Sequence, residues 1–164
     1  MNKLNAVITG VGMYVPETVM DNKYFESIVD TSDEWIMTRT GIKERHKMVN
    51  GTTSDMATFA LQDLLKSKNM SAEELDCIIV ASVTPDMFFP ATACLVQDNI
   101  GARNICGFDM NAACCGFVNA LQIGRGFVES GLYKKVAVIG SDKMSTITDY
   151  SDRNTCILFG DAAS

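Results

Sequence analysis

The sequence places a cysteine at a tight turn between an expected strand and an expected helix. The run Cys106–Met110 leads into the small residues Ala112 and Ala113, then Cys114, and Gly116 opens an amphipathic segment. Small side chains let a backbone turn sharply, as in the elbow that exposes a hydrolase nucleophile. The unpaired N–H groups and the dipole at a helix start favour a thiolate. We therefore expect Cys114 to accept an acyl group from a thioester carbonyl.

Other interpretations of this cysteine stay open on the residues alone. A free cysteine is commonly a small buried side chain without reactivity. Cys115 follows directly, and one position along a helix it points about 100° away, so only one of the two thiols can face a given pocket. A redox role for the pair Cys114 and Cys115 is disfavoured, because adjacent cysteines form only strained disulfides.

The charge of the sequence argues against a nucleic-acid partner. The 164 residues carry a net charge of −6, whereas nucleic-acid-binding domains usually present a basic stripe. The nearest candidate, residues 43–47, is short and interrupted by Glu44. Short charge runs usually lie on solvated surfaces, so we expect a surface segment there. The alternative is a small positive patch for an anionic partner.

Neither a targeting signal nor a metal site is indicated. The apolar run Ala6–Ile8 is too short for a signal peptide, and no stretch has the length of a membrane span. The cysteines form no C-x-x-C pair, and His46 has no cysteine at zinc-finger spacing. Several cysteines lie in apolar contexts, so three disulfides are not expected. We expect a cytoplasmic protein with mostly reduced thiols, no metal and no membrane contact.

Strands and helices alternate along the chain. Apolar, β-prone runs predict strands at Ala6–Thr9, Lys43–Met48, Cys77–Val83, Cys106–Met110, Val136–Gly140 and Cys156–Phe159. The run Cys77–Val83 is continuously apolar, as in strands buried on both faces of a parallel sheet.

Helical spacing of apolar residues fills the intervals between the strands. One helix is expected after the start signal Thr53–Asp55, a capping box at Ser71 and Glu74, and a further helix from Phe117 that stops at Gly131. Strands separated by helices imply an α/β fold, with a mostly parallel sheet and helices on both faces.

Four segments, in family order along the chain, resemble signatures of one enzyme family. Residues 109–117, Asp-Met-Asn-Ala-Ala-Cys-Cys-Gly-Phe, resemble the D-x-x-A-A-C-x-G-F signature around the active-site cysteine of β-ketoacyl-ACP synthase III. Residues 30–45 match a second signature almost throughout, Phe89–Ala91 match a shorter one, and Asp152–Arg153 with Leu158–Asp161 match another. Together they cover nearly the whole chain and are far more specific than any one motif.

The resemblance implies a fold and a reaction. The family has the thiolase fold, a five-layered αβαβα architecture built from two similar halves, of which residues 1–164 would be the amino-terminal half-domain. It condenses a primer acyl-CoA, often acetyl-CoA, with malonyl-ACP and releases CO₂ and CoA. The cysteine takes the acyl group first and malonyl-ACP arrives second, which is covalent catalysis in two steps. No permanently bound cofactor is implied, because the coenzyme A thioester is a substrate. In the family the backbone N–H of the cysteine also helps to form the oxyanion hole.

Further residues take roles from the same resemblance. The residues matching the family's CoA-adenine site are Thr31, Trp35 and Arg153, and Arg39 matches a residue beside the CoA phosphates. From the residues alone, Trp35 and Arg39 lie at i and i+4 on one helical face, where they could stack on an adenine ring or simply pack on their own helix.

The expected partners also follow from the family. The residue matching Phe89 crosses a dimer interface and closes the acyl pocket of the partner, which predicts a homodimer. Arg45, His46 and Lys47 could attract an acidic acyl carrier protein or the CoA phosphates, but His46 is not expected to be a catalytic base.

The family's decarboxylation site uses a His and an Asn from the carboxy-terminal half, and no matching motif occurs in these 164 residues. We therefore expect the carboxy-terminal half, as a second polypeptide or as the rest of a longer chain, to complete the enzyme. Alone, the chain is expected to accept an acyl group slowly and not to condense.

Two alternatives to this function are retained. One is a related synthase of the same fold with a different primer, such as a quinolone- or polyketide-forming synthase or hydroxymethylglutaryl-CoA synthase. The other is a non-catalytic acyl-CoA-binding or interaction protein, which the absence of the His and Asn motifs would suit.

Overall fold

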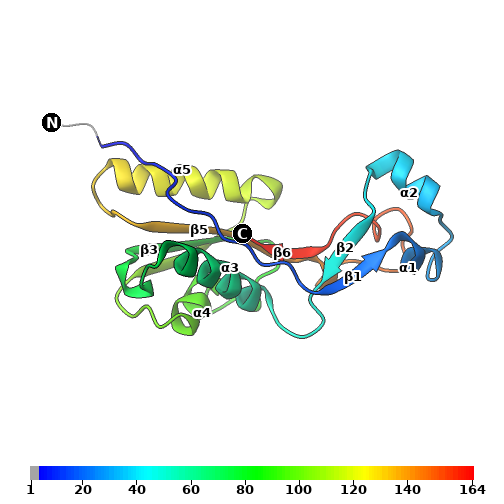
Figure 1. Cartoon of the computed structure of the whole chain (residues 1–164), viewed down its shortest axis with the longest axis horizontal. Helices are drawn as coiled ribbons and strands as arrows, with labels where there is room; N and C mark the ends of the chain where they lie inside the picture. Colours follow the sequence, from blue (N-terminus) through cyan, green and yellow to red (C-terminus); the bar gives the residue numbers. More distant parts are fainter. Residues whose placement is uncertain (1–3) are drawn as a thin grey trace.

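The computed structural model describes residues 4–164. In chain order its elements are β1 (Thr18–Asp21), α1 (Asn22–Glu26), α2 (Asp33–Thr40), β2 (Glu44–Lys47), α3 (Thr53–Lys68), the 3₁₀ turn η1 (Ala72–Glu74), β3 (Cys77–Ala81), α4 (Thr92–Asn99), β4 (Cys106–Met110), η2 (Ala113–Cys115), α5 (Gly116–Glu129), β5 (Val136–Lys143), η3 (Met144–Thr146) and β6 (Asp161–Ala163). Figure 1 shows an α/β body formed by β3 to β6 with α3, α4 and α5, and beside it a small lobe formed by β1, β2, α1 and α2.

The α/β body contains a mixed four-stranded sheet in the order β4-β3-β5-β6. β3 is parallel to both β4 and β5, whereas β6 runs antiparallel to β5. α5 covers one face of this sheet, and α3 and α4 cover the other (Figure 1). The α/β fold with a mostly parallel sheet, predicted from the alternation of strands and helices, is confirmed.

β3 is the centre of the core, and all of its residues are buried. Ile78 and Val80 pack into the cluster beneath α3 and α4, while Ile79 packs into the cluster beneath α5. Burying each of these side chains contributes about 1.5–3 kcal/mol. A Cβ at Gly124 would lie 3.2 Å from Val138 Cγ2, so the absence of a side chain there lets α5 approach β5 closely.

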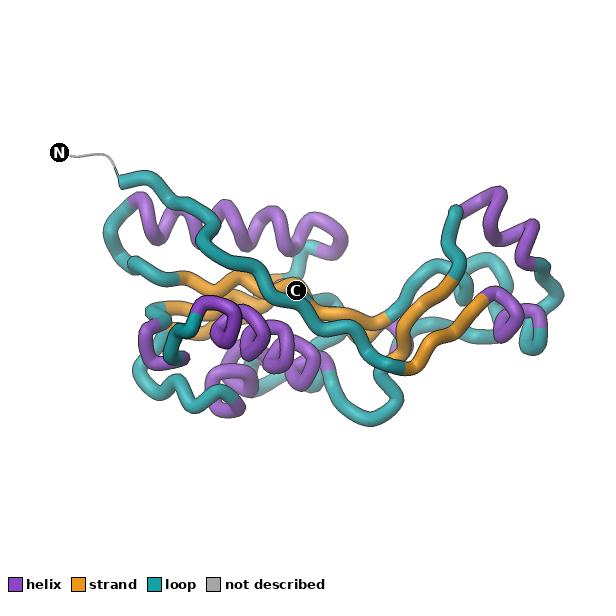
Figure 2. Tube along the Cα trace, viewed as in Figure 1, coloured by secondary structure: helices purple, strands orange, loops and turns teal. Residues whose placement is uncertain are grey.

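Two strand predictions were wrong. Residues 6–9 form no strand (Figure 2), and Val7 and Ile8 are 76% and 77% exposed. One bridge, between Tyr14 and Ala163, ties the end of this segment to the sheet. Because no described strand lies in register with residues 6–9, their backbone groups have no ladder to join.

The second wrong prediction is Cys156–Phe159, which forms turns rather than a strand. The N–H of Cys156 donates to the carbonyl of Asp152, and that of Leu158 to Thr155. Its apolar residues are nevertheless buried, because Cys156 and Ile157 pack with Met20, Phe25 and Ile36 in the core of the small lobe. The strand comes later, at β6 (Asp161–Ala163).

The run at residues 43–47 also departs from its expected surface position. It forms β2, as the weaker strand prediction proposed, and pairs antiparallel with β1. Arg45 is only 3% exposed. Its Nε donates to the carbonyl of Ile157 at 2.6 Å and Nη1 to Asn22 Oδ1 at 2.6 Å, and its guanidinium lies 4.7 Å from the ring centre of Phe25. Arg45 therefore holds the small lobe together and is not part of a surface patch.

A carboxylate at the end of β4 fixes the start of α4. Asp109 accepts hydrogen bonds from the backbone N–H groups of Thr92 at 2.6 Å and Ala93 at 2.7 Å. These are N–H groups that a helix start leaves unpaired, and a negative charge there is favourable. The loop that leads into α4 is thereby anchored to the strand that leads to Cys114.

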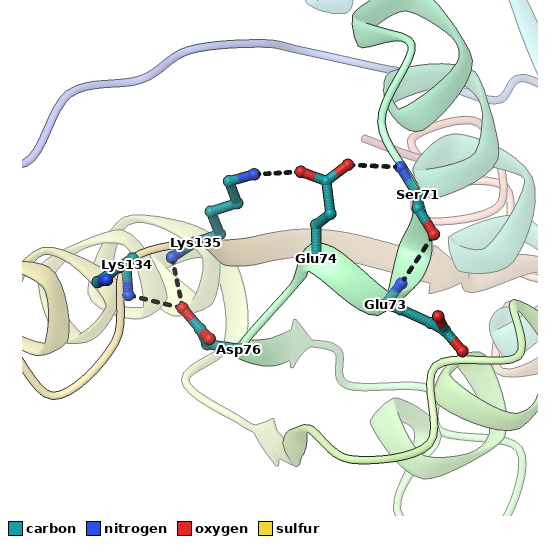
Figure 3. A network of polar contacts seen from close by, with 6 residues as sticks. All are labelled: Ser71, Glu73, Glu74, Asp76, Lys134 and Lys135. Carbon is teal, nitrogen blue, oxygen red and sulfur yellow. Dashed lines mark hydrogen bonds and ion pairs between the residues drawn. The ribbon is translucent and has the colours of Figure 1, made fainter.

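A second carboxylate, that of Asp76, lies where β3, β4 and β5 begin (Figure 3). Asp76, just before β3, accepts hydrogen bonds from the backbone N–H groups of Lys134 at 2.7 Å and Lys135 at 2.9 Å. Its own N–H donates to the carbonyl of Lys135, and its carbonyl accepts from the N–H of Cys106. Asp76 thus ties the beginnings of β3, β4 and β5 together. Beside it, Lys135 also pairs with Glu74 (Figure 3).

The Asp76 contacts predict a dependence of stability on pH. The N–H groups of Lys134, then Lys135, lower the pKa of Asp76 from its ordinary value of 3.8. Because the folded pKa is below the unfolded one, the stabilisation is complete above the unfolded value and is lost as pH falls through the folded value. In urea unfolding between about pH 5 and pH 2, Asp76→Asn should lose less stability than the native chain. The control is Glu73→Gln, because Glu73 donates only through its backbone here (Figure 3). Identical acid profiles for Asp76→Asn and the native chain would contradict the prediction.

Replacing Asp109 should destabilise the fold. Asp109→Ala leaves two N–H groups at the start of α4 without their acceptor, which should lower the free energy of unfolding by about 1–3 kcal/mol. Asp109→Asn keeps one carbonyl acceptor, so its free energy of unfolding should fall by less than that of Asp109→Ala. Urea unfolding at pH 7 measures both, and a native-like stability of the alanine variant would show that the cap is unimportant.

Candidate functional site

Cys114 lies at a sharp turn, as the sequence predicted. β4 ends at Met110, η2 carries the cysteine, and α5 begins at Gly116. Ala113 has a φ of +47°, a left-handed conformation that is uncommon for residues with a side chain. The Ala113 N–H donates to Asn111 Oδ1 at 3.4 Å, and the Cys115 N–H donates to the carbonyl of Ala112 at 3.1 Å.

This turn presents Cys114 at the amino-terminal end of a helix of 14 residues. The thiol is exposed, so Cys114 is not the buried side chain of the alternative interpretation. Cys115 is exposed as well and occupies the residue just before α5. In Figure 1 the amino-terminal end of α5, in yellow-green, lies on the side toward the small lobe.

Phe89 lies at the same edge of the sheet as Cys114. β3 and β4 are parallel, so the loop after β3 and the turn after β4 leave from their common carboxyl edge. Phe89 is 84% exposed and Phe88 fully exposed, in the loop whose far end Asp109 anchors. Large apolar side chains held in solvent by an anchored loop are typical of a surface that another group covers.

A further carboxylate, not singled out from the sequence, fixes the near end of this loop. Asp142 Oδ1 accepts from the Ser82 hydroxyl at 3.0 Å, the Val83 N–H at 2.8 Å, and both the N–H and the hydroxyl of Thr84 at 3.2 and 3.0 Å. The sequence held a signal for this contact. Ser82 and Thr84 follow one apolar strand and Asp142 lies near the end of another, and parallel strands end side by side.

In the small lobe, Trp35 meets two arginines from distant parts of the chain. α2 begins after Ser32, whose hydroxyl accepts from the Trp35 N–H at 3.1 Å. The guanidinium carbon of Arg39, one turn later, lies 4.4 Å from the centre of the indole ring. That of Arg153 lies 4.8 Å from it. The expected i, i+4 arrangement is present, and the fold adds the third side chain.

Unpaired polar atoms lie beside this group. Among residues 4–164, the buried atoms without a hydrogen-bond partner include Thr31 Oγ1 and Arg153 Nε. Arg153 Nη1 lies 3.6 Å from the carboxylate of Asp30, which is fully exposed. An indole ring, two guanidinium groups and free hydrogen-bonding atoms suit a planar heteroaromatic ligand that carries phosphate.

The predicted site residues therefore form two groups. Thr31, Trp35, Arg39 and Arg153 belong to the small lobe and its neighbouring loop, while Cys114 and Phe89 belong to the carboxyl edge of the α/β body. A surface hollow of about 480 Å³ lies elsewhere, and its lining includes Cys94, Gln97 and Arg103 but not Cys114.

Residues 4–164 contain neither a candidate metal site nor a candidate membrane span. His, Cys, Asp and Glu side chains nowhere gather there in a group of three or more that could hold a metal ion. No helix in that range combines the length and the hydrophobicity needed to cross a bilayer.

Known proteins resemble this chain in sequence and in structure. A family model described as 3-oxoacyl-[acyl-carrier-protein (ACP)] synthase III matches residues 108–164. The β-ketoacyl-[acyl-carrier-protein] synthase III of Chlorobaculum tepidum is 56% identical over 162 residues, which are 98% of this chain and 49% of that protein. That of Caldanaerobacter subterraneus is 52% identical over 162 residues, again 98% and 49%.

Solved structures show the same fold. The 3-oxoacyl-[acyl-carrier-protein] synthase III of Aquifex aeolicus superposes with a TM-score of 0.92 at 50% identity, over 98% of this chain and 51% of that one. The priming β-ketosynthase of the R1128 polyketide pathway superposes with a TM-score of 0.94 at 34% identity, over 98% and 48%. The fold is therefore thiolase-like. The chain spans about half the length of the curated relatives it matches.

The match runs through the turn of Cys114 and the small lobe alike, and the chain belongs to the β-ketoacyl-[acyl-carrier-protein] synthase III family, matching the amino-terminal half of its members.

Proposed function

We propose that this chain carries the acyl-accepting half of an enzyme that initiates fatty acid biosynthesis. The observation that carries the proposal is the exposed thiol of Cys114 on a strained turn at the start of α5. A thiolate there attacks the carbonyl carbon of an acyl-CoA, the bond to the CoA sulfur breaks, and CoA leaves. The acyl group remains on Cys114 as a thioester.

The second half-reaction consumes this thioester. Malonyl-ACP loses CO₂, and the electron pair left on its carbon attacks the acyl carbonyl. Cys114 then leaves as a thiolate, and the product is 3-oxoacyl-ACP. The backbone N–H of Cys114 is a candidate donor to the developing oxyanion. The His and Asn of the decarboxylation step would come from the carboxy-terminal half, and no resident cofactor is required.

The group around Trp35 is the candidate binding site for the CoA end of the substrate. Adenine would stack beside the indole ring and form hydrogen bonds with Arg153 Nε and Thr31 Oγ1, which have no partner among residues 4–164. Arg39, exposed beside the same ring, would pair with the phosphates. Two guanidinium groups at one aromatic ring, together with the unpaired Thr31 hydroxyl, support this assignment.

The Phe89 loop is the candidate contact with a second copy. Its exposed phenylalanines, anchored at both ends by Asp109 and Asp142, have the rigidity needed to close an acyl pocket across a dimer interface. The other proposed partners are acyl carrier protein, as donor of the malonyl group, and the carboxy-terminal half. The proposed location is the cytoplasm.

The resemblance to a priming polyketide synthase keeps a different primer as the second candidate. The rates at which Cys114 is acylated by acetyl-CoA and by longer acyl-CoA molecules, measured at equal concentration, distinguish the two primers. The proposal expects acetyl-CoA to load fastest.

The acyl-enzyme step predicts a covalent adduct. Incubation with acetyl-CoA should add one acetyl group to the chain, observed by intact-mass spectrometry under denaturing conditions. Cys114→Ala should abolish the adduct, because it removes the nucleophile. Cys115→Ala and Cys94→Ala, at exposed cysteines, are matched controls and should still be acetylated. An adduct that persists in Cys114→Ala, or no adduct on the native chain, would contradict the assignment.

CoA binding can be followed through Trp35, which is the one tryptophan of the sequence. Adding CoA should change its fluorescence, and Arg39→Ala and Arg153→Ala should each raise the Kd about 2- to 30-fold by loss of cation–π and charge-assisted contacts. Arg125→Ala is the control, because this exposed arginine pairs with Glu129 on α5. If the control weakens CoA binding as much as the other two variants, the site lies elsewhere.

A further inference from the structure

Two cysteines lie side by side at the end of the sheet opposite Cys114. Cys77 and Cys106 are the first residues of β3 and β4, and they are in register with each other. Neighbouring strands are about 4.8 Å apart, within the roughly 4.4–6.8 Å between Cα atoms that a disulfide spans. Because residues in register point to the same face, the two thiols project together beneath α5.

The surroundings confirm that the thiols are neighbours. Burial, and next the charge of the Cys106 thiol, raise the pKa of Cys77 to about 12. A hydrogen bond with the Cys106 thiol is the main cause that raises the pKa of Tyr133. Cys77 and Tyr133 belong to the same apolar cluster. Three groups from three segments therefore meet at one point.

The backbone around this point is fixed. The Cys106 N–H donates to the carbonyl of Asp76 at 3.1 Å, and the Asp76 carboxylate holds Lys134 and Lys135 beside Tyr133 (Figure 3). Because Asp76, the residue before Cys77, links the beginnings of the strands, the folded backbone already holds the two sulfurs close together.

The two thiols differ in access. Cys106 is exposed, whereas Cys77 is completely buried. A small oxidant in solvent can therefore reach Cys106 first, and Cys77 is positioned to react with Cys106 only.

We propose that Cys77 and Cys106 form a redox-active dithiol, which a low-molecular-weight disulfide converts to an internal disulfide. The Cys106 thiolate attacks one sulfur of the small disulfide, whose S–S bond breaks to release one thiolate. The Cys77 thiolate then attacks the Cys106 sulfur and displaces the second small thiolate. Two protein thiols are oxidised and one small disulfide is reduced to two thiolates, which take up the two protons that the protein thiols have lost.

This site is independent of the proposed acyl transfer. Cys106 begins the strand that Met110 ends, so the length of β4 separates the pair from Cys114. Burial raises the pKa of Cys77 and makes its thiolate scarce at neutral pH, so the closing step should speed up as the pH rises.

The test uses the full chain with Cys94, Cys114 and Cys115 replaced by Ala, so that Cys106 is its one exposed cysteine. The chain is treated with oxidised glutathione, free thiols are alkylated under denaturing conditions, and tryptic peptides are analysed by mass spectrometry. The expected product links peptides 69–103 and 104–125, each with one remaining cysteine. Adding Cys77→Ala should stop the reaction at the glutathione adduct of Cys106, and Cys106→Ala should prevent any reaction.

Two results would overturn the proposal. One is a chain with Cys77 intact in which Cys106 keeps its glutathione, and the other is a folded chain in which Cys106 does not react. Circular dichroism establishes that each variant is folded. As a further control, Cys156→Ala removes a buried cysteine of the small lobe and should leave the linked product unchanged.

Discussion

The rest of the structure depends on the parallel pairing of β3 with β4 and β5. β3 is buried on both faces, so its register with its neighbours is fixed by the packing of α3 and α4 on one side and α5 on the other. Parallel strands end at a common edge, and that edge receives both the Phe89 loop and the turn of Cys114. The opposite edge, where the strands begin, receives the pair Cys77 and Cys106. The two proposed reactions therefore lie at opposite ends of one sheet.

Carboxylates that accept backbone N–H groups make these two edges rigid. Asp109 and Asp142 hold the loop after β3 at its two ends, and Asp76 ties the strand beginnings. Each carboxylate satisfies N–H groups that a loop or a helix start would otherwise leave unpaired. A nucleophile gains from such fixed surroundings, because a misplaced thiol reacts slowly even when it is ionised. Asp109, the first residue of the cysteine signature, thus has a structural task, the cap of α4.

The small lobe presents an indole ring between charged groups, and this is where we propose that the adenine of CoA binds. Arg45 is buried to organise it, and its Nε and Nη1 donate to acceptors within the lobe. Arg39 and Arg153 instead lie against Trp35, and Arg153 Nε has no partner among residues 4–164. The contrast between these arginines follows from their partners. The first finds acceptors inside the protein, and the other two face a site where an anionic ligand would provide them.

The sequence by itself determined the central strands, the long helices, the elbow at Cys114 and the pairing of Trp35 with Arg39, because each depends on local periodicity, capping or spacing. Only the tertiary structure decided the rest. Residues 6–9 and 156–159 have the composition of strands, but a strand needs a neighbour in register, and burial of Cys156 came instead from the small-lobe core. Arg45 appeared solvated because its acceptors, Asn22 and Ile157, are distant in sequence. The contact of Arg153 with Trp35 and the proximity of Cys77 to Cys106 likewise arise from pairing between distant segments, which no local pattern records.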